Sequence, residues 1–313
     1  MPALRTVQQL AVLGVLAVLA VAGCGKAKPT AVAKVTQPET YTVTIVIRSY
    51  PNGGGALKRR EVNEQTVAEK IIDATNGKPL TERKMKMSNE VVYTDHVEVP
   101  GDQQPKLMRR SYSLAEDRIE NQSRKLPYEG RTIVFEFKDG KYEASALGLP
   151  PLSSEELAVL ARRVSQPNLV QLYLPKKAVA EGESWTIDVA KAAPVIADGT
   201  DVDIRRSSGT GALTKVYMKP PQRSLFGIIE FNLKLAVTNR VFQGKQKLAW
   251  EPDTYLEFKG SIETAIDGST TEGTVKVKGK FYGKSKHFVL KDKNVAVESD
   301  TEFSSHQERS ADK

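Results

Sequence analysis

The chain has 313 residues, of which 40% are hydrophobic and 27% charged, a composition that excludes wholesale disorder and leaves room for one large domain or two smaller ones. Its net charge of +8 favours contact with anionic lipid, polysaccharide or nucleic acid but does not specify a fold. The single cysteine, Cys24, excludes an internal disulfide and a metal site built from several thiolates.

Residues 1–23 have the pattern of a bacterial signal peptide. Arg5 is the one charged side chain before an uninterrupted apolar and small-residue run from Leu10 to Ala22, which is shorter than the roughly 20 residues that span a bilayer as a helix. The run ends in Val21-Ala22-Gly23-Cys24, which resembles the lipobox of bacterial lipoproteins. That resemblance implies cleavage before Cys24 and lipidation of Cys24, whose thiolate forms a thioether with a lipid that carries acyl chains such as palmitate. A secretory signal with a chance cysteine is the alternative.

An acylated Cys24 predicts a protein anchored to a membrane. One acyl chain holds only marginally, and the two or three chains of a bacterial lipoprotein bury enough methylene groups for stable anchoring. Gly25 stands where an aspartate signals inner-membrane retention in the enteric sorting rule, so by analogy the outer membrane, facing the periplasm, is favoured. Residues 24–38 are therefore expected to form the lipidated N-terminus and a flexible stalk.

Residues 39–150 predict a meander of antiparallel strands, because apolar and polar side chains alternate and the connections are too short for helical crossovers. A strand is expected from Tyr41 to Arg48, and Asn76-Gly77 is a hairpin signal. Later, Asp139-Gly140 turns the chain. The other expected strands are Val62–Ile72, Leu80–Met87, Val91–Val99 and one in which Ile133, Phe135 and Phe137 point inward.

Residues 151–184 contain the most convincing amphipathic helix. Ser153 and Glu156 form an S-x-x-E capping box, and Leu157, Leu160 and Val164 follow at helical spacing on one face. Pro167 ends the regular pattern. We expect this helix to lie on the concave side of a β-sheet and to be followed in the chain by a second set of strands.

Residues 185–303 predict that second set of antiparallel strands, and residues 304–313 a polar tail. A strand is expected at Trp185, Ile187 and Val189, then a short helical turn over Ala190–Ala197. The long strands that follow place Phe231 and Leu233, and then Phe258, on an apolar face. The expected fold class is therefore mainly β, with one or more curved antiparallel sheets or a half-barrel and one central amphipathic helix.

No residue pattern identifies a reaction. His96 follows Asp95 directly, so on a strand the two side chains point to opposite faces, and neither His287 nor His306 has a visible nucleophile or orienting group beside it. The acidic loop from Asp198 to Asp203 offers three carboxylates but lacks the ligand spacing of an EF-hand calcium loop. We expect no catalytic residue, no metal and no other cofactor.

Two sets of residues are candidates for binding. Lys276, Lys278 and Lys280 alternate along one strand and would present ammonium groups about 6–7 Å apart to an anionic lipid or glycan. The alternative is a solvated face whose lysines block edge-to-edge aggregation. Nucleic acid is not expected, because few aromatic residues lie among the basic ones.

The second candidate is an apolar cavity between the sheet and the helix, which would hold a hydrophobic ligand or an acyl chain. A well-packed core has the same sequence pattern and is the commoner outcome. The expected lining residues are Leu157, Leu160, Val164, Phe231, Leu233 and Phe258.

The segment from Gly130 to Asp188 resembles a stretch of uncharacterised bacterial lipoproteins. The matching residues are the hairpin from Gly130-Arg131-Thr132-Ile133 through Tyr142, and Leu174-Pro175-Lys176-Lys177 through Gly182-Glu183-Ser184-Trp185. In architecture alone, strands around a helix behind a lipobox resemble the carriers that ferry lipoproteins across the periplasm. The family of uncharacterised lipoproteins carries no function that could be transferred to this chain. From the lipobox and the lack of a catalytic pattern we expect an exported, membrane-anchored envelope protein with a binding or structural role and no enzymatic activity, or alternatively a carrier of a hydrophobic ligand.

Overall fold

The computed structural model describes residues 42–51, 54–101, 104–148, 150–165, 170–197, 199–220, 223–242 and 246–311. The predicted signal peptide, Cys24 and the predicted stalk lie outside these residues. Within the described ranges, no helix is long and apolar enough to cross a membrane.

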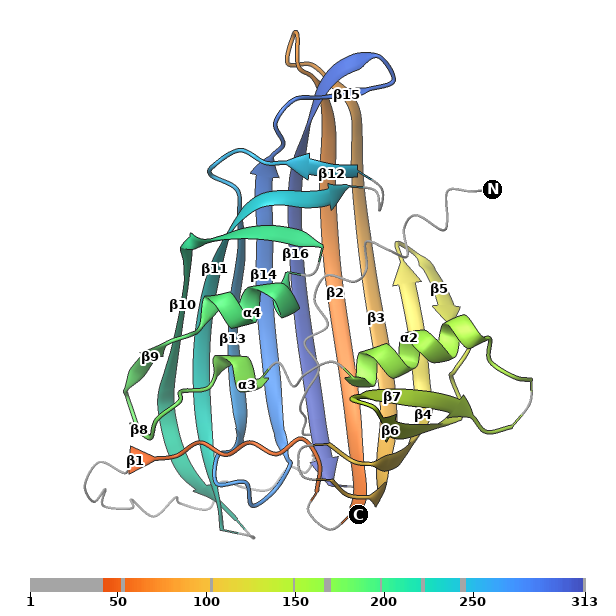
Figure 1. The fold of residues 1–313 in the computed structure, drawn as a ribbon, viewed down its shortest axis with the longest axis vertical. Helices are drawn as coiled ribbons and strands as arrows, with labels where there is room; N and C mark the ends of the chain where they lie inside the picture. The colour runs from red at the N-terminus through yellow and green to blue at the C-terminus, as the bar shows by residue number, and fades with distance from the viewer. Residues whose placement is uncertain are drawn as a thin grey trace.

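The predicted fold class, mainly β with antiparallel pairing, is confirmed. One 14-stranded sheet, which is not closed into a barrel, holds both predicted β regions (Figure 1). Its order is β7-β6-β4-β3-β2-β16-β14-β13-β11-β10-β9, and β5, β12 and β15 pair with single neighbours. The first half comprises β2 (Gly55–Asp73), β3 (Pro79–Val99), β4 (Leu107–Ile119), β5 (Gln122–Lys125), β6 (Thr132–Lys138) and β7 (Lys141–Ala146). The second half comprises β9 (Ser184–Thr186), β10 (Thr200–Lys219), β11 (Ser224–Phe242), β12 (Gln246–Ala249), β13 (Tyr255–Ala265), β14 (Gly273–Lys284), β15 (Phe288–Leu290) and β16 (Lys293–Ala311).

The strand β16 corrects the prediction of a polar tail over residues 304–313. Residues 304–311 are the end of this strand, which pairs with β2 on one side and β14 on the other. Ser305, Gln307 and Arg309 are buried. The prediction was wrong because the buried side chains here are polar, so the apolar alternation that reveals a half-buried strand is missing.

The hairpin predicted at Asn76-Gly77 joins β2 to β3. Gly77 has a φ of +71°, and the Asn76 side-chain oxygen accepts a hydrogen bond from the Lys78 amide. The two strands expected over Leu80–Met87 and Val91–Val99 are one strand, β3, because the intervening polar residues continue the ladder with β2. By contrast, the strand expected over Tyr41–Arg48 is much shorter in the structure. It is β1 (Thr42–Val43), which pairs with β8 (Val179–Ala180).

Three helices lie on one face of the sheet, which we call the helix-bearing face (Figure 1). They are α2 (Ser154–Ser165), α3 (Val170–Tyr173) and α4 (Val189–Ile196). The predicted capping box is present at the start of α2: the Ser153 amide donates to the Glu156 carboxylate at 2.7 Å, and the Glu156 amide donates to the Ser153 hydroxyl at 3.2 Å. The strand expected through Val189 ends at Thr186, because Val189 begins α4.

The helices cover two separate apolar clusters. In the first half of the sheet, α2 packs Leu160 against buried residues that include Ile133 and Phe135. In the second half, α3 and α4 cover a larger cluster that includes Phe231 and Phe258. Between the two clusters, the neighbouring strands β2 and β16 bury Arg59, Gln307 and Arg309. The core of the protein therefore has two apolar parts with a polar region between them.

Glycines allow aromatic rings to lie flat across the second half of the sheet. Gly211 stands opposite Trp185, Gly260 opposite Phe231, and Gly279 opposite Phe303 in the strand registers. A Cβ atom at any of these three glycines would lie less than 3.0 Å from the ring opposite. Their φ angles are not in the left-handed region, so the requirement for glycine comes from space and not from backbone conformation.

We expect Gly279→Ala to lower the free energy of unfolding by about 1–3 kcal/mol, because the added methyl group overlaps the Phe303 ring. Urea denaturation would measure the loss. In a Phe303→Leu background the same substitution should cost clearly less, because the smaller side chain leaves room. An equal cost in both backgrounds would mean that the ring contact is not what requires glycine.

Candidate functional site

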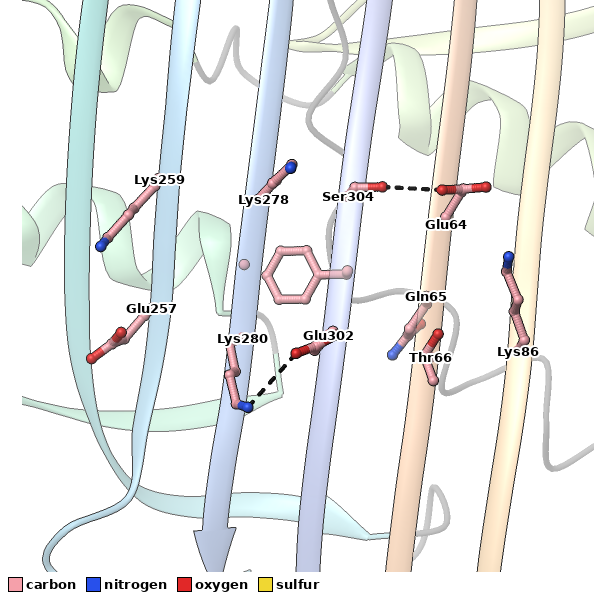
Figure 2. A pocket seen from close by; sticks show the side chains of 12 residues that line it. Glu64, Gln65, Thr66, Lys86, Glu257, Lys259, Lys278, Lys280, Glu302 and Ser304 are labelled. Atoms are coloured by element: carbon pink, nitrogen blue, oxygen red, sulfur yellow. Dashed lines mark hydrogen bonds and ion pairs between the residues drawn. The ribbon is translucent and has the colours of Figure 1, made fainter.

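The face of the sheet opposite the helices, which we call the open face, carries a mixture of lysine and carboxylate side chains. Two adjoining hollows lie on it, with volumes of about 520 Å³ and 550 Å³. Both are lined by Lys259 and Lys278, and Figure 2 shows the first of them, with its charged side chains arranged over β13, β14, β16, β2 and β3. These hollows are the candidate site.

Three lysines lie around the junction of the two hollows: Lys259 on β13, and Lys276 and Lys278 on β14. We call them the lysine triad. The ammonium groups of Lys259 and Lys278 point away from each other (Figure 2). Lys259 stands directly opposite Lys278 in the register of the two strands, and all three side chains are exposed. Like charges directly opposite each other on neighbouring strands destabilise a sheet. None of the three makes an ion pair within 4.0 Å of a residue in the described ranges. The carboxylates of Glu64 and Glu230 line the same hollows but lie farther than that from the three lysines.

The neighbours of the lysine triad can donate hydrogen bonds. Ser261 stands opposite Lys276, Ser304 opposite Lys278, and Asn232 opposite Lys259. The Ser304 hydroxyl already donates to the Glu64 carboxylate at 3.5 Å, which leaves Ser261 and Asn232 as the donors. Hydroxyl and amide groups beside ammonium groups suit an oxyanion, since each oxygen can accept from more than one donor. The nearby carboxylate Glu257 is already paired with Lys234 at 3.2 Å.

The predicted row of Lys276, Lys278 and Lys280 does lie on one exposed face, but its members differ. Lys280 pairs with Asp300 at 3.4 Å and with Glu302 at 3.7 Å. The predicted anion-binding row therefore included one lysine, Lys280, whose charge is neutralised by neighbouring carboxylates. It missed Lys259, because only the register of β13 against β14 shows that this residue faces Lys278.

The six residues expected to line an apolar cavity are not brought together. Leu157, Leu160 and Val164 on α2 pack against the cluster in the first half of the sheet. Phe231, Leu233 and Phe258 belong to the other cluster. There, the Tyr173 ring stacks on Phe231 with centroids 4.2 Å apart, and the Trp185 indole donates to the Tyr173 carbonyl at 2.7 Å. The six residues pack within their two clusters, and Phe231 also lines the second hollow. The carrier hypothesis stays a prediction.

Asp95 and His96 point to opposite faces of β3, as their spacing predicts, with Asp95 buried and His96 exposed. In the acidic loop, Asp201 pairs with Lys247 and accepts from Asn239, while Asp198 lies outside the described residues. Over the described ranges, no three histidine, cysteine, aspartate or glutamate side chains come close enough to hold a metal ion.

The chain matches no protein-family model and no curated protein. Among solved structures, a chain described as "lipid-protein interactions in lipovitellin" is similar over 80% of this chain, with 11% sequence identity and a TM-score of 0.34. The match covers 25% of that lipovitellin chain. This similarity is too weak to indicate a shared fold or function.

We expect Lys278→Gln to raise the free energy of unfolding by roughly 0.2–1 kcal/mol at low salt, because it removes the repulsion from Lys259. The gain should shrink at high salt, where the charges are screened. Lys280→Gln is the matched control on the same strand. It removes two ion pairs and should leave stability unchanged or slightly lower. If both variants gained stability equally, the lysine triad would not be a special site of repulsion.

Proposed function

We propose that the protein is a non-enzymatic, membrane-anchored envelope protein whose open face binds phosphate or carboxylate groups of an anionic envelope component. The observation that carries the proposal is the direct apposition of Lys259 and Lys278 without a carboxylate partner among the described residues. An anionic group seated between them would offset the repulsion that the sheet otherwise retains.

The geometry of the strands supports contact with a single anionic group. Directly opposed residues on neighbouring antiparallel strands have Cβ atoms about 4.5–5.5 Å apart, so one phosphate could contact both ammonium groups once the two exposed side chains, which point apart in Figure 2, turn toward it. Lys276 lies two residues along β14 on the same face, about 6–7 Å away. A row of phosphates or carboxylates would therefore be bound more strongly than one isolated group.

The membrane anchor in the proposal rests on the lipobox resemblance of Val21-Ala22-Gly23-Cys24. Two or three acyl chains on Cys24 would hold the protein at a bacterial membrane, with residues 25–38 between the anchor and the sheet. Tethering raises the local concentration of the open face near anionic headgroups and surface glycans, so a modest electrostatic affinity would be sufficient.

We expect Lys259→Glu/Lys278→Glu to weaken binding to anionic vesicles by about tenfold or more, since each lysine near an anionic surface contributes about 1 kcal/mol. The measurement is sedimentation with vesicles containing phosphatidylglycerol, using the full chain with Cys24→Ser so that acyl chains do not dominate. Lys280→Glu/Lys284→Glu is the control with the same charge change on paired lysines, and we expect a smaller loss from it.

A soluble acidic polysaccharide serves as the second arm of that experiment and distinguishes the two sources of anionic groups. Competition by the polysaccharide at low salt, with weak binding to vesicles, would identify a glycan as the partner. Equal losses for the two double variants, or binding that does not respond to salt, would contradict a role for the lysine triad.

We expect Cys24→Ser to abolish incorporation of labelled palmitate and to release the protein from the membrane fraction, because the thioether cannot form. Metabolic labelling followed by fractionation measures both effects. Alanine at Gly25 is the matched control and should leave acylation intact. Membrane association that survives the loss of Cys24 would contradict the lipid anchor while leaving the lysine triad open to its own test.

A further inference from the structure

A second group of cationic side chains lies on the helix-bearing face, buried in the polar region between the two apolar clusters. Arg59 on β2, Arg110 on β4 and Arg309 on β16 are 5%, 8% and 0% exposed. Arg309 stands directly opposite Arg59 in the strand register. Burying a charge is costly unless it is paired and hydrogen-bonded, so each of the three arginines requires a partner.

Asp95, which is fully buried, forms ion pairs with two of the three arginines. The Nε and Nη2 atoms of Arg110 donate to its two oxygens at 2.6 Å and 3.0 Å, a bidentate pair. The Nε atom of Arg59 lies 3.1 Å from the same carboxylate, and its Nη2 atom donates to the Ser49 carbonyl. Burial opposes the charge on Arg110, but attraction to Asp95, Tyr93 and Tyr112 together holds the pKa of this guanidinium well above its usual value.

Arg309 has no such partner. Its Nη1 atom donates to the Arg48 carbonyl at 2.9 Å, but its Nε and Nη2 atoms have no hydrogen-bond partner in the described part of the chain. Burial and repulsion from Arg59 lower the pKa of Arg309 well below the usual value. The side chain of Gln307, two residues away on the same face and also fully buried, has neither its oxygen nor its nitrogen paired.

The unpaired edge of Arg309 has a defined chemistry. Nε and Nη2 are the two atoms with which Arg110 binds the Asp95 carboxylate, and they form the side of the guanidinium that matches two oxygens of one oxyanion. The Gln307 amide can donate a further hydrogen bond. The carboxylate of Glu61, opposite Gln307 in the strand register, accepts a hydrogen bond from the Tyr93 hydroxyl at 2.5 Å and forms no ion pair with Arg309 within 4.0 Å. A water molecule could satisfy the unpaired donors, but it would supply no negative charge to offset the repulsion between Arg59 and Arg309.

We propose that Arg309 and Gln307 form a buried binding site for a small oxyanion, a carboxylate or a phosphate group, on the helix-bearing face. Arg309 would donate to two oxygens of the anion through Nε and Nη2, and the Gln307 amide would donate a third hydrogen bond to an oxygen of the same anion. Arg59 would supply a second positive charge across the β2–β16 pair. The site lies on the opposite face of the sheet from the lysine triad, so the two proposals are independent.

Residues 47–49, which follow β1, form part of the covering of this site. The carbonyls of Arg48 and Ser49 accept hydrogen bonds from Arg309 and Arg59, and the Gln171 side chain on α3 donates to the Ile47 carbonyl at 3.1 Å. An anion bound to Arg309 would fix the guanidinium that holds Arg48. Binding should therefore stabilise this covering segment together with the fold.

The test measures thermal unfolding of the full chain in sodium phosphate, sodium acetate and sodium chloride at matched ionic strength. We expect the unfolding midpoint to rise with phosphate or acetate concentration beyond the effect of chloride, because a ligand that binds only the folded state stabilises it. Arg309→Met should abolish this dependence. It should not lower stability in chloride, since it replaces an unpaired buried cation with an apolar side chain.

Gln307→Leu should weaken the oxyanion dependence about tenfold or more, because it removes a hydrogen bond to a charged group. Lys278→Gln, on the open face, is the control and should leave the dependence unchanged. If Arg309→Met does not fold, Gln307→Leu alone decides.

A tightly held anion would make the titration flat, so denatured samples of the purified protein are also assayed for released anions by ion chromatography. One equivalent of a carboxylate or phosphate, absent from Gln307→Leu, would support the site. A flat titration with no released oxyanion would overturn it, and so would an unchanged response in Gln307→Leu.

Discussion

The structure depends on the backbone hydrogen bonds of β16. This strand pairs with β2 on one side and with β14 on the other, so it joins the strands of residues 55–146 to those of residues 184–290 in one sheet. No other described strand pairing connects the two halves of the 14-stranded sheet. The apolar clusters under α2 and under α3 and α4 stay separate. The hydrogen bonds of β16 to β2 and β14 therefore join the two meanders into a single sheet.

The side chains of β16 explain why the two clusters do not merge. Ser299, Thr301, Ser305, Gln307 and Arg309 are all buried on the helix-bearing face, where a run of valine or isoleucine would have continued the apolar core. Polar groups in such a position cost stability unless they are paired, and Asp95 pairs with Arg59 and Arg110 but not with Arg309. The same strand thus supplies the continuity of the sheet and the positive charge on which the proposed oxyanion site rests.

Local signals in the sequence predicted the local structure well. The Ser153 and Glu156 capping box, the hairpin at Asn76-Gly77 and the apolar alternation of β11 and β13 each act over a few residues, and each is present as predicted. Long-range features could not be predicted in this way. The apposition of Lys259 and Lys278 depends on strand register, and the pairing of Asp95 with Arg110 depends on both register and face. The polar pattern of residues 304–311 resembles that of a solvated tail, and only its neighbours β2 and β14 make it a buried strand.

The position of β16 also determines how this sheet can form. It is the last described strand to be synthesised, yet its two neighbours are β2, near the start of the described chain, and β14. Until it is added, β2 and β14 each present a row of unpaired N–H and C=O groups, the kind of edge that invites pairing with other chains. Contacts between residues so far apart in sequence form slowly, because a long loop must close before they are gained. The half-made protein would therefore be most vulnerable to aggregation just before its final strand arrives, and a chaperone that shields those two edges would protect it most.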